Sequence, residues 1–273
     1  MTVSRQNELI FSARLSVQYG EKPPVLRDAT LEIRAGEIVG LVGQSGSGKS
    51  TLAMSILGLL ESKRAHCEGV IDFQGRDLMK LSERELRKLR GRQIALVLQS
   101  PLSSLNPALK IRTQLREAWR AHALGSAQEC DAAIRNSLAS VSLPSSDEFL
   151  RKYPSQMSVG QAQRVLIAMA VLHRPALLIA DEATSALDVI TQSEILTLFR
   201  QLNRDTGMAI LYISHDLASV ASICDRIAIL YEGRIVENGT SEQVLNSPQH
   251  EYTRRLMAAI PKMHAGRALA ASI

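Results

Sequence analysis

Residues 43–50 read Gly43-Gln44-Ser45-Gly46-Ser47-Gly48-Lys49-Ser50, which is the spacing of a phosphate-binding loop. An apolar run of strand length, Glu37 to Val42, precedes the loop, and Thr51 to Leu60 carries apolar residues at helical spacing after it. A glycine-rich turn from a strand into a helix can point successive backbone N–H groups at an anion, and the helix N-terminus adds partial positive charge. The sequence therefore predicts a polyphosphate site between a strand and a helix.

Two side chains of the loop are suited to a nucleotide bound with Mg²⁺. Lys49 is expected to reach the β- and γ-phosphates, and the Ser50 hydroxyl is the short, hard oxygen ligand that Mg²⁺ prefers. The nucleotide-binding residues expected in this segment are Gly43, Gln44, Ser45, Gly46, Ser47, Gly48, Lys49, Ser50 and Thr51.

The composition indicates an ordinary globular protein. The 273 residues suffice for one large domain or two small ones, and 45% of them are hydrophobic. Lys and Arg exceed Asp and Glu by 32 to 27, which favours anionic partners but does not choose among nucleotides, acidic lipids and nucleic acid.

The longest apolar run, Val165 to Leu172, is far shorter than the roughly 20 residues that cross a bilayer. With no signal-peptide pattern at the N-terminus, we expect a cytosolic protein.

Strand-like and helix-like segments alternate along most of the chain. From about residue 101 to residue 174, however, the strand patterns vanish and helical patterns take over, which implies a helical insert. Alternation on both sides of this insert favours a mostly parallel sheet covered by helices on both faces. The predicted strands are 9–17, 30–33, 37–42, 70–73, 94–98, 176–180, 209–213 and 226–231, and the predicted helices are 51–60, a segment opened by a Ser82–Glu85 capping box, 111–122, 129–141, 162–172, 190–205 and 216–223.

Polar side chains follow three of the apolar strands at the point where each strand ends. Asp181 is placed to hold Mg²⁺, and the adjacent Glu182 is the candidate base for an attacking water. His215 and Gln99 close two other strands, where an imidazole can contact a γ-phosphate and an amide can contact the metal region. The alternatives are strand-end acids that merely face solvent and a histidine with a structural role.

A second candidate anion site lies at Ser158-Val159-Gly160-Gln161, directly before an apolar helix. The segment offers a hydroxyl and backbone N–H groups at the positive end of that helix. Because one chain has one triphosphate-sized loop, this second site is expected to serve another subunit. A simple helix cap would also explain the serine.

Taken together, these motifs resemble the ATP-binding-cassette (ABC) ATPases over about residues 8–262. The resemblance rests on residues 43–50, Gln99, 158–161, Ala176 to Glu182, Ser185 to Asp188 and His215. It implies ATP hydrolysis by two cassettes paired head to tail, with each ATP between one loop and the partner's Ser158, Gly160 and Gln161. It also implies that Tyr19 stacks on adenine, that Ser50, Gln99 and Asp181 serve Mg²⁺, that Glu182, His215 and Gln99 are catalytic, and that Asp188 connects the two sites.

The resemblance implies an α/β fold built on a phosphate-loop NTPase core with a mostly parallel sheet. An antiparallel β subdomain at the N-terminus and an inserted helical subdomain complete it. We expect core residues at about 8–98 and 175–262, the helical subdomain at about 99–174, and a frayed tail at 263–273.

Two further stretches, 99–107 and 247–261, resemble the oligopeptide, dipeptide and nickel importer subgroup. That resemblance implies membrane permease subunits, a periplasmic or extracellular solute-binding protein, and a position on the cytoplasmic face of the membrane, without nucleic acid. The alternatives are a cassette ATPase of a soluble or enzyme-associated complex, and a nucleotide sensor without turnover.

The chain departs from the family pattern at three places. Val159 stands where glycine is usual, so a position requiring positive φ would strain it and weaken stimulation of the opposite ATP site. Ala183 replaces the usual proline after the candidate base, with little expected effect. The three cysteines, Cys67, Cys130 and Cys224, are widely spaced and none follows Cys224, so an iron–sulfur cluster is not expected.

Overall fold

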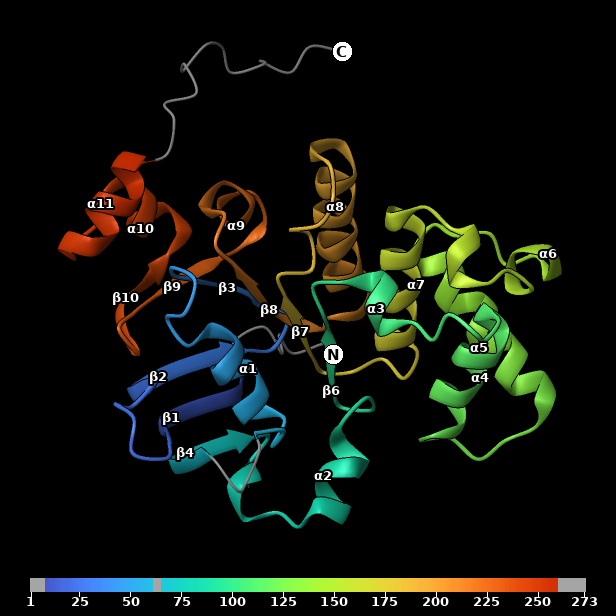
Figure 1. Cartoon of the computed structure of the whole chain (residues 1–273), viewed down its shortest axis with the longest axis horizontal. Coiled ribbons are helices and arrows are strands. Elements are labelled where there is room, and N and C mark those ends of the chain that lie inside the picture. The colour runs from blue at the N-terminus through green and yellow to red at the C-terminus, as the bar shows by residue number, and fades with distance from the viewer. Residues whose placement is uncertain (1–7, 61–64, 260–273) are drawn as a thin grey trace, which may run out of the picture.

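The computed structural model describes residues 8–60 and 65–259 (Figure 1). The N-terminal part forms a four-stranded antiparallel sheet in the order β2-β1-β4-β5. Its β2 strand alternates buried and exposed residues, which is the pattern of a sheet with one face against a core. The strands are β1 (Leu9–Tyr19), β2 (Leu26–Arg34), β4 (Ala65–Phe73) and β5 (Arg76–Asp77).

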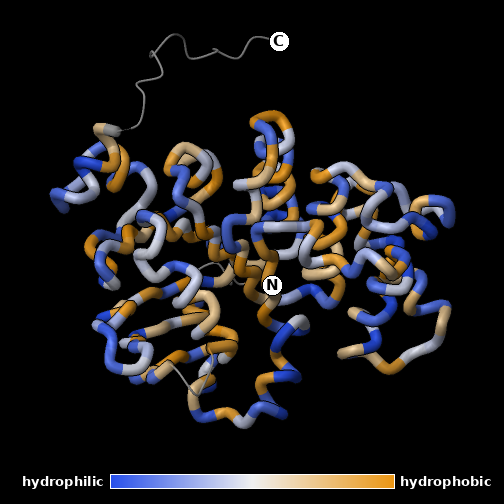
Figure 2. Tube along the Cα trace, in the orientation of Figure 1, coloured by the Kyte–Doolittle hydropathy of each residue, from blue (hydrophilic) through white to orange (hydrophobic). Residues whose placement is uncertain are grey.

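The second sheet has six strands in the order β10-β9-β3-β8-β7-β6, and only the β9–β10 pair is antiparallel. Every residue of β3, β7 and β8 is buried, as expected for apolar strands covered on both faces. Figure 2 shows hydrophobic residues gathered along these central strands. The strands are β3 (Ile38–Val42), β6 (Ile94–Val97), β7 (Leu177–Asp181), β8 (Ala209–Ser214), β9 (Arg226–Tyr231) and β10 (Arg234–Thr240). The predicted α/β fold with a mostly parallel sheet is confirmed.

Two hydrophobic clusters cover the two faces of this sheet. Val39 and Leu41 of β3 pack with the antiparallel sheet and α1, whereas Ile38 and Val42 pack with the helices of the other face. The helices of the nucleotide-binding part are α1 (Lys49–Ile56), α2 (Glu83–Leu89), α8 (Val189–Thr206), α9 (Leu217–Ile223), α10 (Ser241–Asn246) and α11 (Glu251–Ala259). None of the helices in the described ranges is both long and apolar enough to span a bilayer.

Between β6 and β7 the chain is helical, and these helices lie together on the right of Figure 1. They are α3 (Pro101–Ser104), α4 (Ile111–Arg120), α5 (Ala127–Ser140), α6 (Asp147–Leu150) and α7 (Val159–Val171), with a 3₁₀ turn at Pro154–Gln156. A second 3₁₀ turn, Leu78–Lys80, lies outside this region, between β5 and α2. The predicted helical insert is therefore present, and we propose that it spans about residues 99–174 of a domain covering 8–262. The tail predicted to fray, 263–273, lies outside the described residues.

Several predicted boundaries were wrong, and local capping explains the clearest cases. The helix expected at 51–60 ends at Ile56, because Gly58 adopts a left-handed φ of 60° just after it. The helix expected from residue 129 begins at Ala127, because Ser126 and Glu129 form a capping box. The strand expected at 70–73 begins at Ala65, since it pairs with β1 along its whole length. The strands β5 and β10 and the helices α3, α6, α10 and α11 were not predicted.

Candidate functional site

The segment 43–48 carries the chain from the end of β3 into the first turn of α1. Ser47 donates its N–H to the Gln44 carbonyl at 3.2 Å, which closes the turn. Gly48 is the N-cap of α1 with a φ of 107°, and a Cβ atom there would lie 2.7 Å from the Leu26 side chain. The predicted change from strand to loop to helix is therefore present, and its last loop position requires glycine.

Lys49 lies folded into this loop rather than extended into solvent. Its side chain is buried, and Nζ donates to the carbonyls of Gly43 at 2.8 Å and Gln44 at 3.0 Å. Burial lowers the pKa of Lys49, while the nearby Glu182 and Asp181 carboxylates raise it. An ammonium group has three N–H donors, so one donor remains for a phosphate oxygen.

A pocket of about 480 Å³ opens beside the loop. Its lining brings together the ends of three parallel strands and the start of α1, as expected for the edge where parallel strands end. The lining residues are Val25, Ser45, Gly46, Gly48, Lys49, Ser50, Thr51, Gln99, Glu182 and His215. The structure thus groups Gln99, Glu182 and His215 with the loop, and it adds Val25, which no sequence pattern indicated.

Asp181 is the last residue of β7 and is 6% exposed. Its Oδ1 atom has no hydrogen-bond partner within the described part of the chain. Burial raises the pKa of this carboxyl, while the Ser50 hydroxyl and Lys49 lower it. A buried carboxylate oxygen without a partner, beside a serine hydroxyl, is the hard-oxygen donor set that suits Mg²⁺, so the residues present fit this ion.

Glu182 and His215 contact each other at the mouth of the pocket. Glu182 adopts a left-handed φ of 53° and donates its N–H to the Ile213 carbonyl at 2.9 Å. Its carboxylate accepts from His215 Nδ1, at 2.7 Å to Oε2 and 3.0 Å to Oε1. Since a carboxylate cannot donate, Nδ1 carries the proton of this bond, and Nε2 is left for a second partner. Positive φ in a non-glycine residue is a strained conformation of the kind found at functional sites.

The segment 158–161 forms a capping box at the start of α7. Ser158 Oγ accepts from the Gln161 N–H at 3.2 Å, and Gln161 Oε1 accepts from the Ser158 N–H at 3.3 Å. Neither residue lines the pocket of its own chain, and the same holds for Gly160. The helix-cap interpretation therefore applies, and a role at another subunit's nucleotide stays a prediction.

Val159 is the first residue of α7 and does not have a positive φ. The strain that a positive φ would have imposed on this β-branched residue is absent, because the position is helical. The expectation of weaker stimulation depended on that strain, and the conformation of Val159 removes its basis.

Asp188 caps the N-terminus of α8 next to the segment 158–161. Its Oδ1 accepts the N–H groups of Ile190 and Thr191, and its Oδ2 accepts the Thr191 hydroxyl at 2.7 Å. These bonds from Thr191 lower the pKa of Asp188. The Thr191 methyl group packs so closely on Gly160 that a Cβ atom there would lie 2.8 Å away. Thr191 thus joins Asp188 to the 158–161 segment, a link that the sequence did not indicate.

Tyr19 lies at the end of β1, partly buried against the hydrophobic cluster of the antiparallel sheet. It does not line the pocket, whereas Val25, six residues later, does. The two are brought near each other because the Val25 N–H bonds to the Val17 carbonyl at 2.8 Å. Adenine stacking by Tyr19 stays a prediction.

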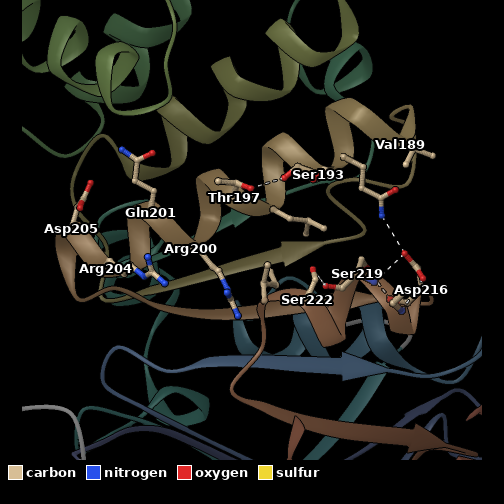
Figure 3. A pocket seen from close by; sticks show the side chains of 14 residues that line it. Val189, Ser193, Thr197, Arg200, Gln201, Arg204, Asp205, Asp216, Ser219 and Ser222 are labelled. Atoms are coloured by element: carbon tan, nitrogen blue, oxygen red, sulfur yellow. Dashed lines mark hydrogen bonds between the residues drawn. The ribbon is translucent and has the colours of Figure 1, made fainter. Parts of the chain in front are cut away.

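A separate groove of about 770 Å³ runs between α8 and α9 (Figure 3). Arg200, Arg204 and Asp205 lie toward one end, and Asp216 and Val189 lie at the other. No residue of the phosphate loop reaches this groove. The nucleotide chemistry predicted from the sequence therefore belongs to the smaller pocket.

Comparison with known proteins agrees with this geometry. Residues 26–185 match the family model described as ABC transporter. The chain is 43% identical over 238 residues to the oligopeptide transport ATP-binding protein OppD of Haemophilus influenzae, covering 87% of this chain and 73% of OppD. It is 40% identical over 254 residues to the glutathione import ATP-binding protein GsiA of Salmonella choleraesuis, covering 91% of this chain and 41% of GsiA, so it spans less than half of that relative.

A solved structure shares the same fold. The ATP-binding cassette MJ0796, described as a dimer in a post-hydrolysis state bound to ADP and Pi, superimposes with a TM-score of 0.73 at 28% identity. The match covers 85% of this chain and 99% of that one. With a family model matched over more than half of its residues and OppD matched over most of both chains, this protein belongs to the ABC transporter family.

Proposed function

We propose that this chain is the ATP-hydrolysing subunit of an ABC importer for peptides or a related small solute, with nickel as a further possibility within the subgroup. The carrying observation is the pocket in which the loop, Gln99, Glu182 and His215 meet beside the buried Lys49. Names of relatives support the transport role, since OppD and GsiA are an oligopeptide transport and a glutathione import ATP-binding protein.

ATP binding depends mainly on the loop in this proposal. Phosphoryl transfer needs positioning and charge neutralisation more than covalent chemistry. The N–H groups from Ser45 to Thr51 surround the phosphates, and Lys49 adds a cation that is already held in place by two carbonyls. Tyr19 supplies an aromatic face for adenine.

Mg²⁺ would be held by Ser50, by Asp181 and by the Gln99 amide. The unpartnered, buried Oδ1 of Asp181 supports this assignment, because such an oxygen costs free energy unless a cation or a donor satisfies it. When bound, the ion supplies positive charge that neutralises the phosphate oxygens.

Glu182 orients and deprotonates the attacking water, and His215 holds the Glu182 carboxylate in place while its Nε2 atom faces a phosphate or the water. Such general-base assistance contributes typically about 10² to 10⁴-fold to a rate. The strained backbone of Glu182 and its bond to Ile213 support this role, since both fix the direction of the side chain.

The proposal includes a second cassette, identical or related. Ser158, Gly160 and Gln161 would contact the ATP held by that partner, and Asp188 would connect the two sites through Thr191. The dimeric cassette MJ0796 supports this pairing. Membrane permease subunits and a solute-binding protein complete the importer, which places this chain on the cytoplasmic face of the membrane.

Three variants test the proposal. Lys49→Ala should bind nucleotide much more weakly, whereas Glu182→Gln should keep MgATP binding and lose hydrolysis by about 10² to 10⁴-fold. Ser247→Ala, distant in sequence from the loop, serves as the control and should keep both properties. Binding by the Lys49→Ala variant equal to wild type would refute the site.

Purification of the protein from membranes should bring down an integral membrane subunit with it. Recovery of a soluble enzyme complex in its place would refute the transport role.

A further inference from the structure

We propose that Tyr252 is a positioning residue of the phosphate loop, which connects the C-terminal helix α11 to nucleotide affinity by orienting the peptide that holds Lys49. The inference rests on the proposed nucleotide site. It assigns a role to part of the stretch 247–261, which the proposed function leaves without one.

The contact joins residues that lie more than 200 positions apart. The Gln44 N–H donates to the Tyr252 hydroxyl at 3.2 Å, and Tyr252 is 8% exposed. Gln44 does not line the nucleotide pocket, although Ser45 and Gly46 do. Tyr252 therefore holds the loop from the side away from the pocket, where a bound phosphate would not compete for the same N–H.

The peptide unit between Gly43 and Gln44 links Tyr252 to Lys49 through hydrogen bonds on its two sides. Its N–H bonds to Tyr252, while its carbonyl, on Gly43, accepts from Lys49 Nζ at 2.8 Å. The N–H and the C=O of a trans peptide are fixed relative to each other, so the tyrosine that orients one also orients the other. Hydrogen bonds in such a chain also polarise and strengthen one another.

Tyr252 is itself held firmly. Its ring stacks on Tyr231 with centroids 4.1 Å apart and an interplanar angle of 22°. The chain before it is fixed because Glu237 accepts the N–H groups of Gln249 at 2.8 Å and His250 at 3.1 Å. Burial raises the pKa of Tyr252, so the oxygen that accepts from the Gln44 N–H belongs to a neutral phenol.

Removing the hydroxyl should lower the fraction of loops in the binding-ready arrangement. Without the bond, the Gly43–Gln44 peptide can rotate in the free protein, and apparent affinity falls by the fraction that remains competent. The loss expected for Tyr252→Phe is about 3- to 10-fold in the dissociation constant of MgADP, which matches one ordinary hydrogen bond. The KM for ATP should rise in parallel while kcat stays within about twofold of wild type.

The experiment measures MgADP binding to four variants of the full chain by isothermal titration calorimetry. Tyr231→Phe is the matched control, since it also removes one hydroxyl from the same ring stack, but that hydroxyl makes no hydrogen bond to residues 43–50 within the described part of the chain, and the variant should bind as wild type. Lys49→Ala tests the proposed site itself. In the Lys49→Ala, Tyr252→Phe double variant, the second change should have no further effect, because the route through Lys49 is gone.

The outcomes separate the inference from the proposed site. Wild-type affinity in Lys49→Ala refutes the site. A weakened Lys49→Ala together with an unaffected Tyr252→Phe, or equal losses in Tyr252→Phe and Tyr231→Phe, refutes the inference alone. An additive loss in the double variant also refutes it.

Hydrogen exchange of the wild-type protein tests the contact without any variant. In the absence of nucleotide, the Gln44 amide should exchange more slowly than those of Ser45 and Gly46, which have no acceptor within residues 8–60 and 65–259. Exchange of Gln44 as fast as its neighbours would overturn the proposal even if Tyr252→Phe failed to fold.

Discussion

Asp181→Asn should make the nucleotide-free protein more stable while it removes the response to Mg²⁺. Asp181 is 6% exposed, and its Oδ1 atom has no partner in the described residues. A neutral polar group left unsatisfied in the interior costs about 1 to 3 kcal/mol and a charged one costs more, so asparagine, which keeps a buried amide there, removes only the excess due to the charge. Ser50 and Lys49 offset part of this cost. We expect a gain near the lower end of that range, which is a rise in Tm of about 2 to 6 °C.

The pH dependence of this gain follows from the raised pKa of Asp181. A carboxyl whose pKa is raised by folding contributes stability in its protonated form, and that contribution is lost as pH rises through the folded pKa. The penalty in the wild-type protein therefore grows as pH rises, whereas asparagine, which does not titrate, carries no such pH-dependent penalty. The difference in Tm between the two proteins should be largest at neutral pH and shrink as pH falls toward about 4, the ordinary range of an aspartate.

Thermal unfolding in EDTA, followed by circular dichroism, measures the gain, and Asp205→Asn on the exposed end of α8 is the control. A saturating ligand at 100 times its dissociation constant adds about 2.7 kcal/mol. In the wild-type protein part of the stabilisation by ADP should require Mg²⁺, and this part should vanish in Asp181→Asn. An Asp181→Asn variant with a lower Tm than wild type in EDTA at neutral pH would show that the Asp181 carboxylate does not destabilise the folded protein.

Three further predictions concern single residues. Val159→Gly should leave ATP hydrolysis within about twofold of wild type, because the helical Val159 carries no strain to relieve, and a large gain in an ATPase assay would contradict this. Gly48→Ala should lose about 1 to 2 kcal/mol in the free energy of unfolding, since an L side chain is disfavoured at its φ of 107°; urea unfolding with an unchanged midpoint would be the contrary result. The thiol of Cys224, whose pKa burial raises, should resist iodoacetamide at pH 8 until the protein unfolds, which mass spectrometry can follow, and rapid labelling of the folded protein would exclude such burial.

Local sequence decided what could be predicted. The phosphate loop was found because its glycine spacing, strand and helix are contiguous in the chain. The grouping of Gln99, Glu182 and His215 was found because parallel strands end at a common edge, so a polar residue after each apolar run is enough to place it. The contact between Glu182 and His215 was not predicted, because it depends on β7 and β8 being neighbours in the sheet, an order that the sequence did not indicate.

Contacts that depend on irregular backbone could not be predicted in this way. Val25 reaches the pocket through the loop after β1, and Thr191 reaches Gly160 because two helix N-termini converge. The bond from Gln44 to Tyr252 joins distant parts of the chain through α11, a helix that the sequence pattern did not predict. Neither strand alternation nor helical periodicity reports on such pairings, since each depends on where a turn directs the chain.

Two buried charged side chains and one strained backbone conformation lie close together at the end of β7. Lys49 and Asp181 are both buried and charged, and Glu182 has a backbone conformation that non-glycine residues rarely adopt. The two opposite charges do not satisfy each other, because Lys49 bonds to loop carbonyls and Asp181 Oδ1 is left without a partner among the described residues. An arrangement selected for stability alone would pair or neutralise these groups. Beside the phosphate loop, Lys49 and Asp181 do not pair with each other, so Lys49 is free to bind an anion and Asp181 is free to bind a cation. Substitutions that stabilise the fold at these positions should therefore remove function.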